Sequence, residues 1–136
     1  MKVSPNAPCP CHSGAKYKKC CRPFHKGTLA PSPLALMRSR FAAYALGEVE
    51  YLQDTTDPEG EHFRPDRGAW AVEIAHYCKR TAFEGLEVKD HGEDGDQGWV
   101  EFRAALKQGT DDLSFSERSR FTRRGGRWLY TAGVAQ

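Results

Sequence analysis

The chain of 136 residues is long enough for one ordinary domain and a short appendage, and its 39% hydrophobic content is enough for a packed core. The net charge of +2 hides an asymmetry, because residues 1–47 carry eight Lys or Arg and no acid, whereas residues 48–136 carry twelve basic and eighteen acidic side chains. No stretch approaches the roughly 18 apolar residues of a membrane span or the apolar run of a secretory signal, so we expect a cytoplasmic globular protein.

Four of the five cysteines lie within the thirteen residues CPCHSGAKYKKCC, which begin at Cys9 and end at Cys21. In a reducing compartment clustered cysteines are more often metal ligands than disulfides, and the adjacent Cys20 and Cys21 are poorly placed to bond with each other. A tetrahedral zinc ion needs four such ligands, and the cluster supplies four: Cys9, Cys11, Cys20 and Cys21. We therefore predict one structural zinc per chain, in a closed site with no open position for water.

Three helices are predicted after the cysteine cluster, beyond a short linker that contains proline. Ser32 is a suitable N-cap with Pro33 at the first helical position, and apolar residues keep a period near 3.6 until Gly47 ends the helix. A short second helix is expected over residues 49–55. A third is expected over residues 67–79, where aromatic and aliphatic residues form one stripe.

The pattern then changes to the alternation that is typical of strands. Four strands are predicted, separated by turns rich in Gly and Asp, over residues 83–90, 99–107, 113–122 and 127–134. Four strands after three helices indicate an α+β fold with an antiparallel sheet. Trp70, Trp99 and Trp128 are expected in its core, and the lone Cys78 is expected there as a small hydrophobic residue.

The cysteine cluster resembles the SEC-C motif, first recognised at the C-terminus of the SecA preprotein translocase motor. The pattern of that motif is C-P-C-x-S-G-x-x-Y-x-x-C followed by His or Cys. The matching positions are Cys9, Pro10, Cys11, Ser13, Gly14, Tyr17, Cys20 and Cys21. The resemblance implies the same four cysteine ligands. Because Cys21 stands where the SecA version has histidine, His12 or His25 is an alternative ligand in place of one cysteine.

The rest of the chain is similar to the YchJ-like proteins, small uncharacterised bacterial proteins that join a SEC-C motif to a nuclear-transport-factor-two-like domain. The matching stretches are LMRSRFAAY, EYLQDTTDP and ERSRFTRRGGRWLYTAG. The resemblance implies a zinc knuckle over residues 1–28. Over residues 29–136 it implies a cone-shaped domain of three helices packed on a bent antiparallel sheet of about four strands. The family offers no established activity to carry over.

The composition of the knuckle also predicts how it folds. Residues 1–27 contain few large apolar side chains, so zinc is expected to supply most of the folding free energy of this part. We therefore expect the knuckle and the cone to fold independently, and removal of zinc to unfold the knuckle alone.

Strand alternation predicts a polar group inside the cone. Glu117 and Ser119 share their parity with three apolar residues that are expected to face inward: Leu113, Phe115 and Phe121. A carboxylate placed there needs a cation, which Arg38 or Arg40 of the first helix can supply. We predict first a buried structural ion pair, with a polar pocket floor for an anionic or polar ligand as the alternative. A catalytic role is less favoured, because an ion pair lowers the pKa of a glutamate that would have to act as a base.

Two functions remain open at this point. The preferred one is an adaptor whose basic zinc knuckle contacts a protein, with a ribosome or nucleic acid as further candidate partners. The alternative is a small-molecule-binding protein or an enzyme that uses the cone, although the chain has no P-loop, G-x-S-x-G or dinucleotide-binding fingerprint. His62, His76 and His91 are expected to be surface or hydrogen-bonded histidines rather than catalysts. A filled apolar cone would favour the adaptor, whereas an open cavity with Arg38, Arg40 and Glu117 around it would favour a ligand.

Overall fold

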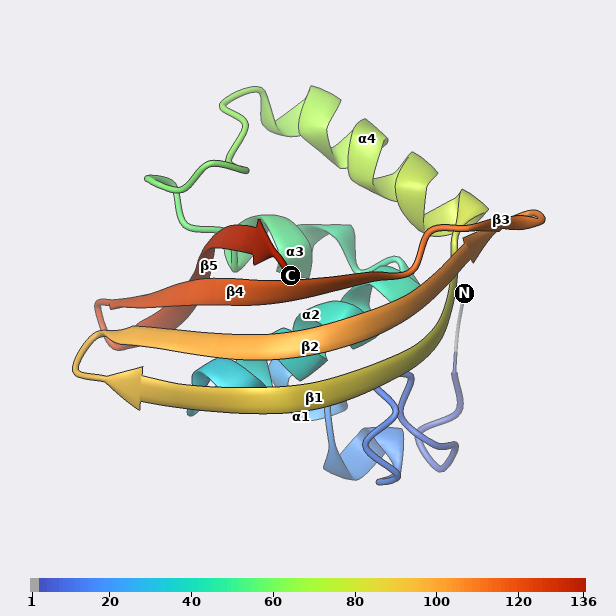
Figure 1. The fold of residues 1–136 in the computed structure, drawn as a ribbon, viewed down its shortest axis with the longest axis horizontal. Helices are drawn as coiled ribbons and strands as arrows, with labels where there is room; N and C mark the ends of the chain where they lie inside the picture. The colour runs from blue at the N-terminus through green and yellow to red at the C-terminus, as the bar shows by residue number, and fades with distance from the viewer. Residues whose placement is uncertain (1–2) are drawn as a thin grey trace.

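The computed structural model describes residues 3–136 and joins a small N-terminal knuckle to a cone-shaped domain (Figure 1). The knuckle contains a 3-10 turn and a short helix: η1, Tyr17–Lys19, and α1, Arg22–His25. The cone begins with three helices: α2, Pro33–Leu46; α3, Val49–Asp54; and α4, Arg67–Arg80. Five strands follow: β1, Ala82–Asp94; β2, Gln97–Gln108; β3, Asp111–Asp112; β4, Phe115–Arg124; and β5, Arg127–Ala135. The predicted α+β class is confirmed.

A capping side chain marks the start of each of the two long helices. The side chain of Ser32 accepts a hydrogen bond of 3.1 Å from the backbone N–H of Ala35 at the start of α2. Gly47 ends α2 in the left-handed conformation, with φ at 71°, which glycine adopts without a steric penalty. Asp66 caps α4 in the same way, because its side chain accepts from the N–H of Ala69 at 3.0 Å. Local sequence therefore sets both long helices.

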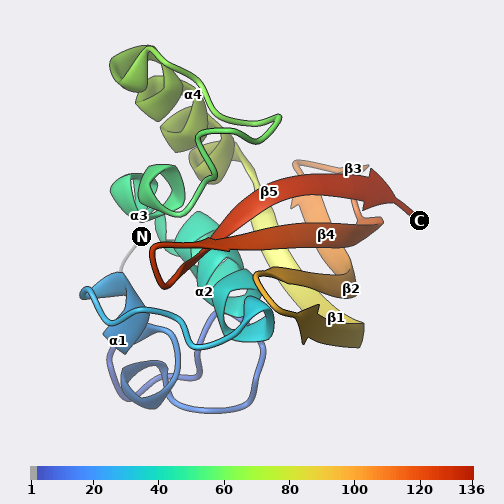
Figure 2. The same ribbon diagram turned by 90° about the vertical axis from the view of Figure 1, so that its left-hand side faces the viewer.

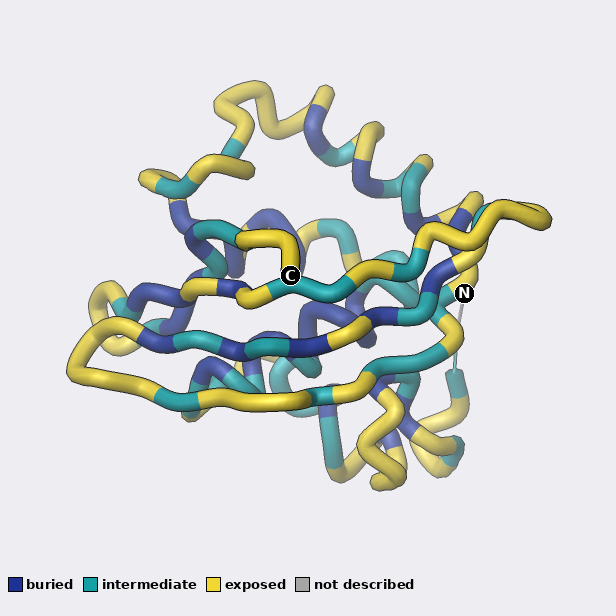
Figure 3. Tube along the Cα trace, viewed as in Figure 1, coloured by how far each residue is buried: buried dark blue, intermediate teal, exposed yellow. Residues whose placement is uncertain are grey.

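The strands form one bent antiparallel sheet in the order β1-β2-β4-β5, with the two-residue β3 paired to β2. Helix α2 lies along the concave side of this sheet, and the knuckle lies on the side of α2 that faces away from the sheet (Figure 2). Apolar side chains from α2 and the sheet form the main core: Leu36, Met37, Phe41, Val100, Phe102, Phe121 and Trp128. Figure 3 shows buried positions along β2 and α2, whereas β1 is largely exposed. Because α2 is covered on two sides, its side chains reach either the sheet or the knuckle.

The strand predicted over residues 113–122 begins later than predicted. In the structure β4 starts at Phe115, and Leu113 and Ser114 connect it to the short β3; the Ser114 hydroxyl accepts a hydrogen bond of 3.1 Å from the Leu106 N–H. Because Leu113 lies in this connection and not in a strand, its side chain does not follow the alternation of β4. Leu113 is 41% exposed, so the prediction that it faces inward is wrong. Glu117 and Ser119 keep the predicted parity and line the concave side.

The three tryptophans do not all lie in the core. Trp70 and Trp128 are buried as predicted. Trp99 is only half-buried, on the outer face of the sheet, so the prediction for this residue is wrong. Its ring N–H donates to the carboxylate of Asp90 at 3.3 Å, and the guanidinium of Arg118 lies 5.2 Å from its ring centroid. Trp99 alternates with the buried residues of β2, and this alternation places it outside.

Helix α4 packs against the other two helices of the cone. Its buried stripe of Trp70, Ile74 and Cys78 packs against Ala43 of α2 and Leu52 of α3. Cys78 is therefore a small core residue, as predicted. Neither α4 nor any other helix within residues 3–136 is long and apolar enough to cross a membrane.

A buried carboxylate after α3 holds the end of the β4–β5 hairpin. The carboxylate of Asp57 accepts two hydrogen bonds from the guanidinium of Arg124, at 3.0 and 3.1 Å, and one from the hydroxyl of Thr131 at 3.0 Å. Burial alone would raise the pKa of Asp57, but the hydrogen bonds from Arg124 and the Glu59 N–H outweigh it and lower the pKa. The Asp57 N–H also donates to the carbonyl of Tyr130 at 2.8 Å. These contacts tie the segment after α3 to the sheet.

Candidate functional site

The cysteine cluster of the knuckle is the first candidate site. All four Sγ atoms lie within 4.8 Å of one another, with Cys11 and Cys20 at 3.5 Å and Cys20 and Cys21 at 3.9 Å. Bonds of about 2.3 Å to a tetrahedral zinc ion place sulfur atoms about 3.8 Å apart, so the cluster is compatible with one metal ion. Three of the four cysteines are buried, and Cys20 is partly buried. The fold thus brings the predicted set together: Cys9, Cys11, Cys20 and Cys21.

Short-range backbone bonds set the geometry of this cluster. The N–H of Cys9 donates to the carbonyl of Ala15 at 2.8 Å. His12 turns the chain between the cysteine pairs at φ 61°, which is uncommon for a residue other than glycine, and its N–H donates to the Cys9 carbonyl at 3.1 Å. The hydroxyl of Ser13 lies 3.2 Å from the sulfur of Cys20. The knuckle therefore closes around the sulfur atoms through local bonds rather than through a large apolar core.

Without a metal ion the pKa values of the thiols differ from one cysteine to another. The hydrogen bond with Cys11 raises the pKa of Cys9 to about 12. Hydrogen bonds from Cys21 and then from Cys9 lower the pKa of Cys11, so Cys11 is the thiolate that its neighbours stabilise. A metal ion held by the four cysteines would stabilise all four thiolates, so the remaining protons would be released on binding.

The two histidines that were alternative ligands have other partners. The Nε2 atom of His12 donates to the carbonyl of Phe83 at 3.2 Å. The Nε2 atom of His25 donates to the carbonyl of Ser39 at 2.8 Å, and its Nδ1 atom accepts from the hydroxyl of Tyr17 at 2.7 Å. Burial lowers the pKa of His25, in agreement with this neutral ring. Both histidines connect the knuckle to the cone.

The knuckle and the cone share a packed interface. Ala42 of α2 belongs to the same buried cluster as Cys9, Cys11 and Cys21. The guanidinium of Arg38, also on α2, donates to the carbonyl of Cys11 at 3.2 Å. These contacts show that the two parts share a buried interface, and their independent folding stays a prediction. In this interface the surface of α2 forms one wall of the small core of the knuckle.

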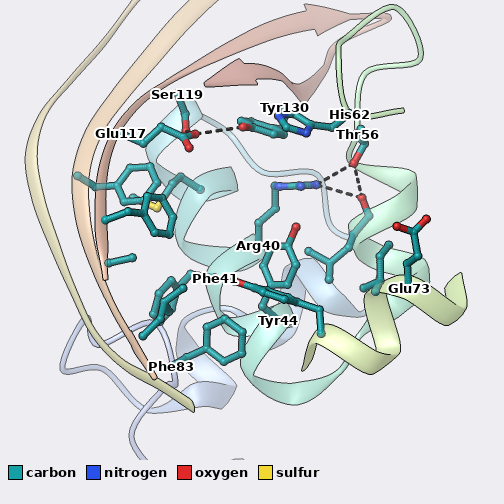
Figure 4. A pocket seen from close by; sticks show the side chains of 18 of the residues that line it. Arg40, Phe41, Tyr44, Thr56, His62, Glu73, Phe83, Glu117, Ser119 and Tyr130 are labelled. Atoms are coloured by element: carbon teal, nitrogen blue, oxygen red, sulfur yellow. Dashed lines mark hydrogen bonds between the residues drawn. The ribbon is translucent and has the colours of Figure 1, made fainter. Parts of the chain in front are cut away.

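The cone contains the second candidate site, a cavity of about 520 Å³ between the helices and the sheet (Figure 4). Arg40, Glu117 and Ser119, which were predicted for a pocket, line it. Much of the remaining wall is aromatic: Phe41, Tyr44, Phe83, Phe102, Phe115 and Phe121. The cone is therefore open rather than filled by side chains.

Arg40 extends from α2 into this cavity and is only 8% exposed. Its Nη1 atom donates to the carbonyl of Leu52 at 3.0 Å and to the hydroxyls of Thr55 and Thr56 at 2.8 and 3.2 Å. Its guanidinium lies over the ring of Tyr130, 4.9 Å from the centroid, in a cation–π contact. The end of α3 and strand β5 therefore hold the Arg40 side chain in one place.

Glu117 makes no ion pair within 4.0 Å anywhere in the described chain, so the predicted Glu117–Arg pair is wrong. Its Oε1 atom accepts from the hydroxyl of Ser119 at 2.7 Å and from the hydroxyl of Tyr130 at 3.0 Å. The carboxylate lies over Gly133, where a methyl group would overlap it. Figure 4 shows the hydroxyl of Tyr130 directed to Glu117 and the guanidinium of Arg40 beside the face of its ring. The phenol thus satisfies the carboxylate that was expected to need an arginine.

Arg38 lies outside the cavity, which corrects its predicted place in a pocket. Arg38 and Arg40 are two positions apart on α2, so they point to different sides of the helix. The structure places the guanidinium of Arg38 at the knuckle, on the carbonyl of Cys11. Only Arg40 of this pair is available to a molecule in the cone.

Tyr130 is the cavity residue that the sequence analysis missed. Besides its contacts with Arg40 and Glu117, its ring stacks on that of His62, with centroids 5.3 Å apart. Burial, and then the negative charge of Glu117, raise the pKa of Tyr130 well above its usual value, so the phenol keeps its proton. Tyr130 shares its parity with the buried Trp128 on β5, and this signal was present in the sequence. His62 lies in an irregular segment, where no periodicity indicates its position.

The mouth of the cavity carries more positive than negative charge. Its exposed ionisable residues are Arg64, Arg80, Glu73, His62 and His76. The complete lining holds three arginines and two glutamates. Such an excess raises the local concentration of small anions.

Comparisons with known proteins match both parts of the chain. Residues 32–133 match the family model described as "YchJ, middle NTF2-like domain", and residues 6–23 match the SEC-C motif. A UPF0225 protein from Deinococcus radiodurans is 43% identical over 129 residues, which cover 93% of this chain and 88% of that protein. A UPF0225 protein from Streptomyces coelicolor is 39% identical and covers 95% of this chain and 96% of its own length.

Two solved structures resemble the whole molecule. The solution structure of a SEC-C motif containing protein from Rhodopseudomonas palustris has a TM-score of 0.81 and 38% identity, with 96% of this chain and 99% of that chain covered. The crystal structure of a SEC-C motif containing protein from Psychrobacter arcticus has a TM-score of 0.75 and 25% identity, with 94% and 82% covered. The chain therefore belongs to the UPF0225 family of YchJ-like proteins and joins a SEC-C motif to an NTF2-like (nuclear-transport-factor-two-like) domain.

Proposed function

We propose that this protein is a zinc-stabilised small-molecule-binding protein. The observation that carries the proposal is the open cavity of about 520 Å³, lined by Arg40 and Glu117. Ligand pockets commonly have volumes of about 300–1,000 Å³, with apolar walls and a few polar groups that orient the ligand. The sequence analysis predicted that an open cavity with Arg38, Arg40 and Glu117 around it would favour a ligand. Arg38 lies outside the cavity, but Arg40 and Glu117 line it.

The proposed metal is zinc, in a structural role. Four thiolates match the ligand preference of zinc and leave no position for water or a substrate. A cytoplasmic location, where thiols stay reduced, suits such a site. Ala42, which packs on the cysteine cluster, lies two positions from Arg40 on α2. Metal binding thereby stabilises the helix that carries the arginine of the cavity.

Identification of the small molecules that co-purify with the protein tests this function. Wild-type protein from its native cell is expected to release at least one organic molecule on denaturation, detected by mass spectrometry. The control variant is Ala104→Trp, because Ala104 lines the cavity and is 1% exposed, so the larger ring fills the volume. Circular dichroism checks that this variant is folded. Recovery of the same molecules from both proteins, or of none from either, would contradict the proposal.

The basic knuckle supports a second candidate function, contact with an anionic macromolecule. Five exposed cations lie within or beside the cysteine cluster: Lys16, Lys18, Lys19, Arg22 and Lys26. None of them forms an ion pair within residues 3–136, so their charge is available to a partner. An adaptor of this kind would bind an acidic protein surface or the RNA of a ribosome, and its affinity would fall steeply with salt.

Cosedimentation with purified ribosomes at low and high salt tests the adaptor function. The triple variant Lys16→Ala/Lys18→Ala/Lys19→Ala should lose binding at low salt. The matched control replaces three exposed lysines of the cone: Lys79, Lys89 and Lys107. Equal binding by the two triple variants would contradict a role for the knuckle in this contact.

A further inference from the structure

Arg40 presents an unused pair of hydrogen-bond donors to the cavity. Its Nη1 atom makes all three of its hydrogen bonds to the protein, which leaves Nε and Nη2 without a protein acceptor. No buried side-chain nitrogen or oxygen in residues 3–136 lacks a partner, so both atoms reach open volume, and Arg40 lines the cavity. Nε and Nη2 form one edge of the guanidinium, which binds the two oxygens of a carboxylate in parallel.

The charge of Arg40 also lacks a counterion in contact. The residue is 8% exposed, and no ion pair within the described residues includes it. Buried charges are normally paired, because removal of an ion from water is costly. Tyr130 offers only its ring face, and its hydroxyl is directed to Glu117. An anionic ligand supplies the partner that the protein does not.

The wall of the cavity near Arg40 selects an apolar body. Phe41 and Tyr44 of α2 both contact the ring of Phe83, with centroids 5.8 and 6.0 Å apart. Such a wall favours an aromatic or branched hydrocarbon over a sugar or a nucleotide. Glu117 lines the same volume, and its Oε2 atom accepts no hydrogen bond from the protein. This carboxylate disfavours a second negative charge on the ligand.

We infer that the ligand of the cone is an apolar monocarboxylate. Its carboxylate binds Nε and Nη2 of Arg40, and its hydrocarbon body lies against the aromatic wall. Arg64 and Arg80 at the mouth attract such an anion. The inference rests on the proposed binding function and adds the chemical class of the ligand.

Isothermal titration calorimetry with three matched probes tests the inference: 2-naphthylacetate, 2-naphthylacetamide and 2-naphthyl phosphate. We expect 2-naphthylacetate to bind at least about tenfold more tightly than the neutral amide or the dianionic phosphate. Arg40→Lys keeps the charge but loses the two parallel donors, so it should weaken binding of 2-naphthylacetate by about tenfold. The matched control is Arg38→Lys on the same helix, which should leave this affinity unchanged, because Arg38 points to the knuckle.

Glu117→Gln is a second test variant, which can be used if Arg40→Lys does not fold. This variant should bind 2-naphthylacetate more tightly than the wild type and should discriminate less against 2-naphthyl phosphate. Equal wild-type affinity for the carboxylate and the amide would overturn the ligand class and leave the proposed binding function standing. Failure of every probe to bind, while a molecule still co-purifies with the wild type, would also overturn the ligand class alone. Equal weakening by Arg38→Lys and Arg40→Lys would remove the special role of Arg40.

Discussion

The knuckle and the cone build their candidate sites in opposite ways. The four cysteines of the knuckle lie within thirteen residues, and local backbone bonds bring their sulfur atoms together. The polar group of the cavity combines Arg40 of α2, Glu117 of β4 and Tyr130 of β5, which are far apart in the sequence. A local site of this kind depends on its metal ion to stay folded, whereas the cavity depends on the core around it.

Helix α2 contacts both candidate sites. Ala42 packs on the cysteine cluster, and Arg40 reaches the cavity from the same helix. Phe41, between them in the sequence, belongs to the main core. We therefore expect loss of a bound metal ion to act first on the knuckle and then, through α2, on the position of Arg40.

The largest effect is expected from loss of the metal site. Protein purified under reducing conditions should hold about one zinc ion per chain, and Cys20→Ser should lose it, with a binding free energy of about 10 kcal/mol that stabilises the knuckle. Cys78→Ala is the matched control, because Cys78 lies in the core of the cone. Elemental analysis measures both variants. Equal zinc content in the two would contradict the metal assignment.

Chelation of zinc should loosen α2 as well as the knuckle. Ala42 and Arg38 lose their contacts with the cysteine segment when it unfolds, so amides of α2 should exchange hydrogen faster. Strand β4 has no such contact and is the internal control. Hydrogen exchange read by mass spectrometry follows both segments. Faster exchange confined to residues 3–28 would support the independent folding that the sequence predicts.

A smaller but still large effect is expected at Asp57. Asp57→Asn removes a buried carboxylate that accepts from Arg124 and Thr131, so the free energy of unfolding should fall by about 2–3 kcal/mol. The matched control is Asp54→Asn, because the Asp54–Arg67 pair is about half exposed and should contribute less than about 1 kcal/mol. Urea unfolding measures both. Equal losses of unfolding free energy in the two variants would mean that the buried Asp57 contacts stabilise the fold no more than the exposed Asp54–Arg67 pair does.

The Asp57 contribution should also depend on pH in a defined direction. The pKa of Asp57 is lowered in the folded protein, so its carboxylate stabilises the fold above the pKa of the unfolded chain, and this stabilisation is lost as the pH falls through the folded pKa. The difference in unfolding free energy between the wild type and Asp57→Asn should be constant near neutral pH and shrink below a pH of about 4. A difference that grows on acidification would have the wrong sign.

The smallest effect is expected at Glu117. Glu117→Gln breaks no ion pair, and an amide oxygen still accepts from Ser119 and Tyr130, so the loss should be about 1 kcal/mol or less. The same urea experiment measures it. A loss of about 3–5 kcal/mol, typical of a broken buried ion pair, would restore the pairing with arginine that the sequence predicted.

Local features of the sequence predicted most of the fold and the cysteine cluster. The cap residues Ser32 and Gly47 act on their immediate neighbours, so the bounds of α2 follow from them. The cysteines likewise depend on their own spacing. Alternation placed Glu117 on the concave side because side chains of a strand point to opposite faces in turn.

The partners of these residues were harder to predict, because they depend on how distant elements pack. Alternation says that Glu117 faces inward, but not that its carboxylate contacts Tyr130 and Gly133 of β5. The choice between Arg38 and Arg40 depends on the rotation of α2 between the sheet and the knuckle. The apolar periodicity of α2 does not predict this rotation, because one face of the helix packs on the sheet and another on the knuckle.

A crystal structure of the protein purified from its native cell, with data collected at the zinc absorption edge, tests the central claim most directly. That claim is that a zinc-stabilised cone binds a small molecule. We predict an anomalous peak between the sulfur atoms of the cysteine cluster and continuous density for an organic molecule beside the guanidinium of Arg40. A zinc peak together with a cavity that holds only water, or that is filled by rearranged side chains, would contradict the account.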